Sequence, residues 1–136
     1  NPTVDAQFSA QYTTALTLWK GTPRLDDFDA ETIRAREEVA RLAQSVSVEE
    51  FEQEAPAATP IDVHIELHGG ATYRQRVDHP KGSPANPMSE DELEAKFHDC
   101  LDHAAVPYTD SRRDRLLRGD ATMAEAGDVA ETIRLL

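Results

Sequence analysis

The hydrophobic positions near the start of the chain repeat with the period of an α-helix. Within residues 6–20 they are Phe8, Tyr12, Ala15, Leu16 and Trp19. This spacing predicts one helix with a single buried face, because residues three, four and seven positions apart share a side of a helix. Gly21 and Pro23 predict its end.

A second helical pattern begins at Asp29, which suits an N-cap, and runs to about Val46. Its inward-facing residues are predicted to be Ile33, Val39, Ala40, Leu42, Ala43 and Val46. Residues 49–59 are acidic and rich in alanine and proline, which is typical of a surface connection.

Residues 61–67 alternate between apolar and polar side chains, which predicts a half-buried β-strand. The apolar set is Ile61, Val63, Ile65 and Leu67, and Tyr73 and Val77 continue it after a turn. A two-residue turn would place this set beside polar residues of the next strand. A three-residue loop over 68–70, with Gly70 left-handed, pairs Ile65 with Tyr73 instead. We therefore predict the three-residue hairpin loop.

A proline-rich stretch, D-H-P-K-G-S-P-A-N-P, separates the hairpin from the next helix. Ser89 and Glu92 have the spacing of a capping box and predict where that helix starts. Its apolar face consists of Leu93, Phe97, Cys100, Leu101 and Ala104. Ser111 is predicted to cap a short helix ended by Gly119, and Asp128 to cap a final one.

The order of predicted elements is α-α-β-β-α-α-α. This places the chain in the α+β class, with helices packed on a small sheet that contains the hairpin. An isolated two-stranded hairpin is marginally stable in water, so this one is expected to join further strands or pack on helices. The sequence offers few further strands, which indicates a missing piece or a partner.

The chain is acidic and has the size of one domain, with 136 residues and a net charge of −12. That charge argues against nucleic acid or an anionic membrane as the main partner, because both attract clustered lysine and arginine. No segment resembles a membrane span or a signal peptide, so a cytoplasmic location is expected. The chain opens with Asn1 rather than methionine, so the start of the native protein is expected to be missing.

The histidines and the single cysteine do not form a metal-binding pattern. His64 and His68 on the predicted strand have no third ligand nearby in sequence. Cys100 points away from the histidines of its own helix and is expected in the apolar core. The acidic pair at 26–27 is typical of a solvated surface, and no nucleotide-binding motif or nucleophile elbow is present. No metal or cofactor site is therefore expected.

Tyr12 fits two different roles. On the apolar stripe it is expected to pack in the core with its hydroxyl hydrogen-bonded. Ser9 and Gln11 beside it add hydrogen-bonding groups near a helix N-terminus, where an anion such as a carboxylate is favoured. Core packing and a weak carboxylate site are both compatible with these residues.

Two segments carry the residue order of a known family. They are A-Q-F-S-A-Q-Y-T-T-A-L-T-L-W-K-G and H-P-K-G-S-P-A-N-P-M-S-E-D-E-L-E-A-K-F. They resemble the patterns A-x-F-S-x-x-Y…A…G and Y-P-K-G-x-P-x-N-P-L-S-x-x-E-L-x-x-K-F of the MmgE/PrpD superfamily. That superfamily includes 2-methylcitrate dehydratase, cis-aconitate decarboxylase and iminodisuccinate epimerase. The hairpin and the final G-D-V-A-E-T-I-R-L-L follow the same order, so the resemblance covers nearly the whole chain.

The resemblance implies a particular domain organisation. Members of the superfamily combine a large helical domain with a smaller α/β lid domain. Residues 1–107 are then expected to form part of the lid. Residues 108–136 are expected to be the C-terminal helices that return to a helical domain absent from this chain.

The same resemblance implies site residues. Tyr12 matches the family's active-site tyrosine, with Ser9 and Gln11 as nearby substrate-binding residues. Lys81 is expected at the edge of the cleft as a further substrate-binding residue. His79 stands where many relatives have tyrosine and receives no role. The histidine, lysine and aspartate residues credited with proton transfer lie upstream, outside this chain.

The implied function is the C-terminal section of a lyase or isomerase acting on a small di- or tricarboxylic acid. Such enzymes remove a proton α to a carboxylate without metal or organic cofactor. Whether this chain is itself an enzyme stays open, because it lacks the main acid and base residues. It is expected to need an N-terminal helical section, as a separate subunit or as the rest of a cut chain, in a homo- or hetero-oligomer. The alternative is a stand-alone, non-catalytic binding or assembly module of the same fold.

Overall fold

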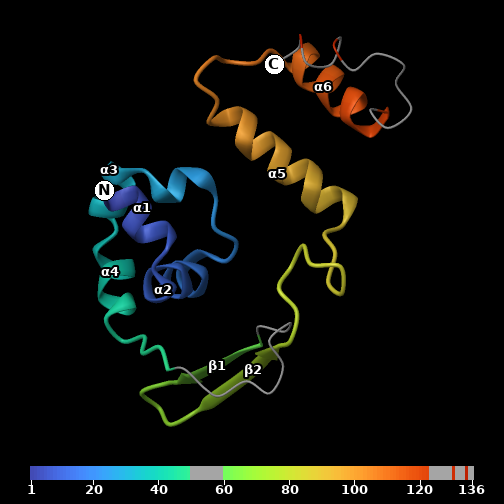
Figure 1. Cartoon of the computed structure of the whole chain (residues 1–136). Helices are drawn as coiled ribbons and strands as arrows, with labels where there is room; N and C mark the ends of the chain where they lie inside the picture. The colour runs from blue at the N-terminus through green and yellow to red at the C-terminus, as the bar shows by residue number, and fades with distance from the viewer. Residues whose placement is uncertain (50–59, 123–129, 131–133, 135–136) are drawn as a thin grey trace. The chain divides into compact units, whose positions relative to one another are not determined.

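The protein is described by a computed structural model that covers residues 1–49, 60–122, 130 and 134. These residues form an α+β arrangement, which confirms the predicted fold class (Figure 1). The elements are α1 (Pro2–Gln7), α2 (Ala10–Lys20), the 3-10 helix η1 (Leu25–Phe28), α3 (Ala30–Ala35), α4 (Glu37–Ala43), β1 (Ile61–Glu66), β2 (Thr72–Val77), α5 (Glu90–Asp102) and α6 (Asp110–Thr122). Two compact units result, one from residues 1–49 with 94–136 and one from residues 50–93.

The first helical region is two helices rather than the one predicted. Ser9 interrupts it, because its Oγ accepts the Tyr12 backbone N–H at 3.1 Å and so starts α2 afresh. Phe8 becomes the C-cap of α1 and is 86% exposed, so its predicted place on the buried face is wrong. Tyr12 is buried with its α2 neighbours, whereas Trp19 is half exposed.

The second helical region is also divided. The backbone leaves the helical conformation at Arg36, with φ −96° and ψ 67°, which separates α3 from α4. Of the predicted inward residues, Val39 is fully buried and Ala40 is exposed, because α4 starts in a new register after the break. The core of this unit consists of Ala6, Tyr12, Ala15, Leu16 and Val39, with Phe28, Ile33, Leu42 and Ala43 packed against it.

The hairpin has the predicted register. Ile61 pairs with Val77 and Ile65 with Tyr73 in an antiparallel sheet of two strands. Gly70 is left-handed, with φ 81°, and its N–H donates to the Leu67 carbonyl at 2.8 Å. The predicted half-burial is wrong for β2, which is exposed along its whole length with Tyr73 at 59%, and for Ile61 in β1, which is 52% exposed.

The proline-rich stretch folds as a compact loop closed by its own hydrogen bonds. The Gly82 N–H donates to the Asn86 carbonyl at 2.8 Å, and Asn86 Nδ2 donates to the His79 carbonyl at 3.0 Å. Ser89 and Glu92 then form the predicted reciprocal cap, with contacts of 2.7 and 3.2 Å. The loop therefore ends in a fixed helix start.

Helices α5 and α6 differ from the prediction in detail. Leu101 is buried, but Cys100 is exposed and is not a core residue, because the inward face of α5 includes Asp99 instead. Thr109 rather than Ser111 caps α6, accepting the Arg112 N–H at 3.4 Å. The helix continues through position 119, since one glycine costs about 1 kcal/mol without ending a helix. The predicted final helix lies outside the described residues, apart from positions 130 and 134.

The hairpin glycines provide a matched test of the loop. We expect Gly70→Ala to destabilise the hairpin by about 1–2 kcal/mol, because alanine is strained at a left-handed position. Gly69→Ala is the control, since an added Cβ meets nothing within 4 Å at either glycine and only Gly70 has a positive φ. Cross-strand NOEs and amide exchange in β1 and β2 measure the effect. Equal losses of hairpin stability in Gly70→Ala and Gly69→Ala would contradict the three-residue loop.

Candidate functional site

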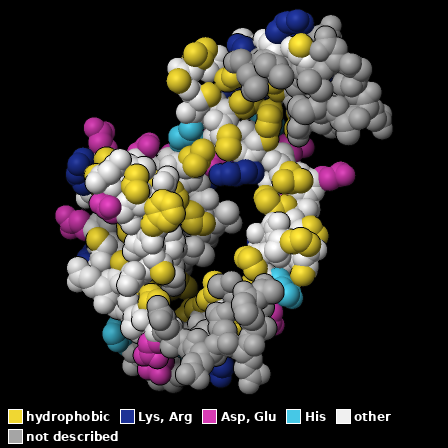
Figure 2. Space-filling model, in the orientation of Figure 1, with side chains coloured by type: hydrophobic (Ala, Val, Ile, Leu, Met, Phe, Trp, Pro, Cys, Tyr) yellow, Lys and Arg dark blue, Asp and Glu magenta, His cyan; other side chains and the backbone are white. Residues whose placement is uncertain are grey.

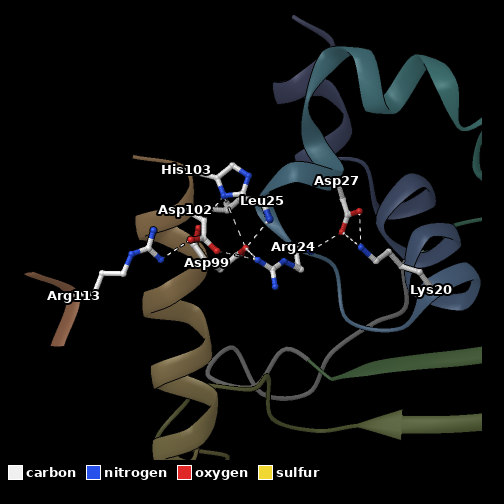
Figure 3. A network of polar contacts seen from close by, with 8 residues as sticks. All are labelled: Lys20, Arg24, Leu25, Asp27, Asp99, Asp102, His103 and Arg113. Carbon is white, nitrogen blue, oxygen red and sulfur yellow. Dashed lines mark hydrogen bonds and ion pairs between the residues drawn. The ribbon is translucent and has the colours of Figure 1, made fainter. Parts of the chain in front are cut away.

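A buried carboxylate lies at the centre of the first unit. Asp27 in η1 is fully buried, although its sequence neighbourhood predicted a solvated acidic surface. Its two oxygens accept hydrogen bonds from Lys20 Nζ at 2.7 and 2.8 Å, and one also contacts Arg36 Nη1 at 2.5 Å. The Arg24 backbone N–H donates to it at 2.6 Å (Figure 3). The Asp27 carboxylate therefore joins three parts of the chain, which are the end of α2, the start of η1 and the break between α3 and α4.

Burial and hydrogen bonding act on the pKa of Asp27 in opposite directions. Removal from water is the largest single influence and raises the pKa. The hydrogen bonds from Lys20, the Arg24 backbone and Arg36 together outweigh it, so the pKa lies below its ordinary value of 3.8. Asp27 is therefore a buried anion at neutral pH.

Arg36 is held on two sides. One nitrogen contacts Asp27, and the guanidinium carbon lies 5.2 Å from the centre of the Trp19 ring in a cation–π contact. The side chain keeps 19% of its surface exposed, so it still reaches solvent. The irregular backbone at this position places the guanidinium between the end of α2 and η1.

The Tyr12 hydroxyl is buried and has no hydrogen-bond partner among the described residues. Its ring packs at a tilt against Phe28, with centroids 6.3 Å apart. Burial raises the pKa of the hydroxyl, the Arg36 guanidinium lowers it, and the Asp27 carboxylate raises it, with a net increase. Since buried hydroxyls normally find a partner, this one marks a candidate binding position.

A second polar cluster extends from the first. Leu25 donates its backbone N–H to buried Asp99 on α5 at 3.1 Å, and the Arg24 guanidinium lies 3.0 Å from the same carboxylate. Asp102 on α5 contacts Arg113 on α6 at 2.5 Å (Figure 3). No sequence pattern predicts these pairs, because Leu25 and Asp99 are 74 positions apart.

The MmgE/PrpD C-terminal domain model matches residues 1–120 of this chain. The chain belongs to the MmgE/PrpD family. This confirms the resemblance carried by the two sequence segments. No match of significance exists among the curated proteins or among the solved structures.

Three of the predicted site residues of this MmgE/PrpD domain lie at the start of α2. The Ser9 hydroxyl donates to Gln11 Oε1 at 3.3 Å while it accepts the Tyr12 backbone N–H. Ser9 is therefore occupied by local contacts. Tyr12 is the only one of the three whose side-chain polar atom is both buried and without a partner in the described part of the chain.

Lys81 belongs to the other unit. Its Nζ lies 2.8 Å from Glu92 Oε2, and both side chains are about half exposed. The hydrogen bond from Lys81, with that from the Ser89 backbone, lowers the pKa of Glu92. Lys81 thus supports the residue that caps α5, a contact the sequence did not predict.

In the described ranges, no group of three His, Cys, Asp or Glu side chains is placed to hold a metal ion. Nor is any helix within those ranges both long and apolar enough to cross a membrane.

Asp27 has a testable effect on stability. We expect Asp27→Asn to lower the free energy of unfolding at pH 7 by about 3 kcal/mol, because it leaves two partly buried cations without their anion. The stability supplied by ionised Asp27 is fully present above its unfolded-state pKa. It is lost as the pH falls from about 3.8 through the lower folded-state pKa.

Urea unfolding from pH 7 to pH 2 checks this expectation, with the exposed neighbour Asp26→Asn as the control. The difference in the free energy of unfolding between wild type and Asp27→Asn should narrow below about pH 3.8. A gap that stays constant down to pH 2 would mean that the folded state does not favour the ionised form.

Proposed function

We propose that this chain forms the C-terminal section of an MmgE/PrpD lyase or isomerase, similar to 2-methylcitrate dehydratase. The reaction removes a proton α to a carboxylate of a small di- or tricarboxylic acid, and needs no metal or organic cofactor. The family membership supports this proposal. The observation that carries it is the buried Tyr12 hydroxyl, a donor with no partner in the described residues, whose pKa is influenced by the charges of Asp27 and Arg36.

The raised pKa suits Tyr12 to act as an acid or hydrogen-bond donor. A phenol with a pKa above its ordinary value of 10 stays protonated at neutral pH. It can therefore donate a hydrogen bond to a substrate oxygen on which negative charge develops, or protonate a leaving hydroxide. It is poorly suited to act as the base that removes the α proton.

That base has to come from elsewhere. The histidine, lysine and aspartate residues that the family resemblance places upstream lie outside this chain. We therefore propose an N-terminal helical section as partner, in the same chain or as a separate subunit, with residues 108–136 packing on it. Val4, Phe8, Leu18 and Trp19 are exposed hydrophobic residues of the first unit, which supports a surface that a partner covers. Figure 2 shows hydrophobic side chains at the molecular surface.

One observation favours a second candidate. The Tyr12 hydroxyl is fully covered in the described arrangement, so a substrate reaches it only if the side chains over it move. Without such movement the chain would act as a stand-alone binding or assembly module of the same fold. Turnover by the assembled protein distinguishes the two candidates.

Tyr12→Phe separates catalysis from folding. We expect it to leave stability unchanged or raise it by about 1 kcal/mol, because it removes a buried hydroxyl that has no partner. Turnover of 2-methylcitrate by the chain combined with its N-terminal section should fall by about 100-fold or more. Tyr73→Phe, on the exposed hairpin, is the control.

Two outcomes would count against this proposal. Unchanged turnover in Tyr12→Phe would remove Tyr12 from the site. Turnover by this chain alone would remove the need for a helical partner.

Lys81 is tested by comparison with its ion-pair partner. If Lys81 binds substrate, Lys81→Gln should raise KM about tenfold in the assembled enzyme, whereas Glu92→Gln should not, because glutamine keeps the capping box. Both variants should change stability by less than about 1 kcal/mol, since the pair is half exposed. Lys96→Gln on α5 is the control. Equal KM values in all three variants would show that Lys81 does not bind substrate and that its role is the ion pair with Glu92.

A further inference from the structure

We propose that Arg36, held in place by Asp27 and Trp19, binds a carboxylate group of the substrate, with Lys20 as a second cation. This inference rests on the proposed function and adds residues to it. The sequence did not single out Arg36 or Lys20, and the acidic pair that includes Asp27 was predicted to lie on the solvated surface.

The hydrogen-bonding capacity of Arg36 is only partly used. A guanidinium carries five N–H groups, and the contact with Asp27 is made through Nη1. Within residues 1–49 and 60–122, Asp27 is the only hydrogen-bonding or ionic partner found for the Arg36 side chain. The remaining N–H groups reach solvent through the exposed fifth of the side chain. They are available to an incoming anion.

The orientation of the guanidinium is fixed before any ligand binds. The guanidinium lies over the Trp19 ring and donates a hydrogen bond to Asp27 through Nη1. An arginine restrained in this way loses little conformational freedom on binding, and its planar fork matches the two oxygens of a carboxylate. Asp27 and Trp19 are therefore positioning residues.

The local charge favours an anion. Lys20 and Arg36 supply two positive charges against the single negative charge of Asp27. The excess is +1 in a chain whose net charge is −12. The Lys20 side chain is 27% exposed, and its ammonium group donates to both Asp27 oxygens. A carboxylate at this position would meet attraction that most of the acidic surface does not offer.

The same position is coupled to the Tyr12 hydroxyl. Phe28 follows Asp27 directly and packs on the Tyr12 ring, and the charges of Arg36 and Asp27 both act on that hydroxyl. A substrate carboxylate bound to Arg36 therefore brings acceptor oxygens toward the region of an unsatisfied donor. Arg36 would hold the substrate, and Tyr12 would contact a second oxygen once the side chains that cover its hydroxyl move.

The test uses the full chain and tricarballylate, a tricarboxylate that cannot undergo the reaction. We expect saturable shifts of the Arg36 Nε–Hε and Trp19 Nε1–H NMR signals during titration. Arg36→Gln should weaken binding at least tenfold, and Arg36→Lys should weaken it several-fold, because lysine keeps the charge but loses the planar fork. Arg34→Gln, an exposed arginine on α3, is the matched control and should bind like wild type.

Folding is checked in each variant by urea unfolding, and Arg36→Lys keeps the test decisive if Arg36→Gln does not fold. Wild-type affinity in both Arg36 variants, or the absence of saturable shifts in the wild type, would overturn the inference and leave Arg36 as a structural ion-pair partner. The proposed function fails separately. Binding at Arg36 without turnover by the assembled protein would contradict the proposed reaction. Turnover that does not depend on Arg36 would contradict only the proposal that Arg36 binds the substrate.

Discussion

The first unit depends on the neutralisation of one buried negative charge. Asp27 has no contact with solvent, so its carboxylate must be matched by donors from the protein. Those donors come from Lys20 at the end of α2, the Arg24 backbone before η1, and Arg36 between α3 and α4. These contacts bring three parts of the chain to one carboxylate. The hydrophobic core around Leu16 and Val39 gives this region its stability, and Asp27 determines how the helix ends meet.

Arg24 connects the contacts around Asp27 to helix α5. Its backbone N–H binds Asp27, while its side chain lies beside Asp99 and Asp102 on α5 (Figure 3). Asp102 in turn contacts Arg113 on α6. Arg24 and Arg113 thus form ion pairs that join one helix to another. The hydrogen bond from the Arg113 side chain is the main reason that the pKa of Asp102 is low.

The functional proposals follow from what this arrangement leaves unsatisfied. The Asp27 carboxylate is fully hydrogen-bonded, whereas the nearby Tyr12 hydroxyl has no partner in the described residues and Arg36 retains donors. A buried donor without an acceptor is unfavourable unless something binds it. A carboxylate substrate would supply acceptor oxygens. The polar contacts that shape the fold would in this way also prepare the binding position.

The sequence determined the features that depend on near neighbours. The hairpin register followed from alternation and from the left-handed preference of Gly70, and the α5 start followed from Ser89 and Glu92, three positions apart. Family membership followed from ordered motifs. Only the tertiary structure decided that Arg36 interrupts its helix and that Asp27 is buried. The physical reason is that a buried charge depends on partners from several elements, which helical periodicity and capping rules do not specify.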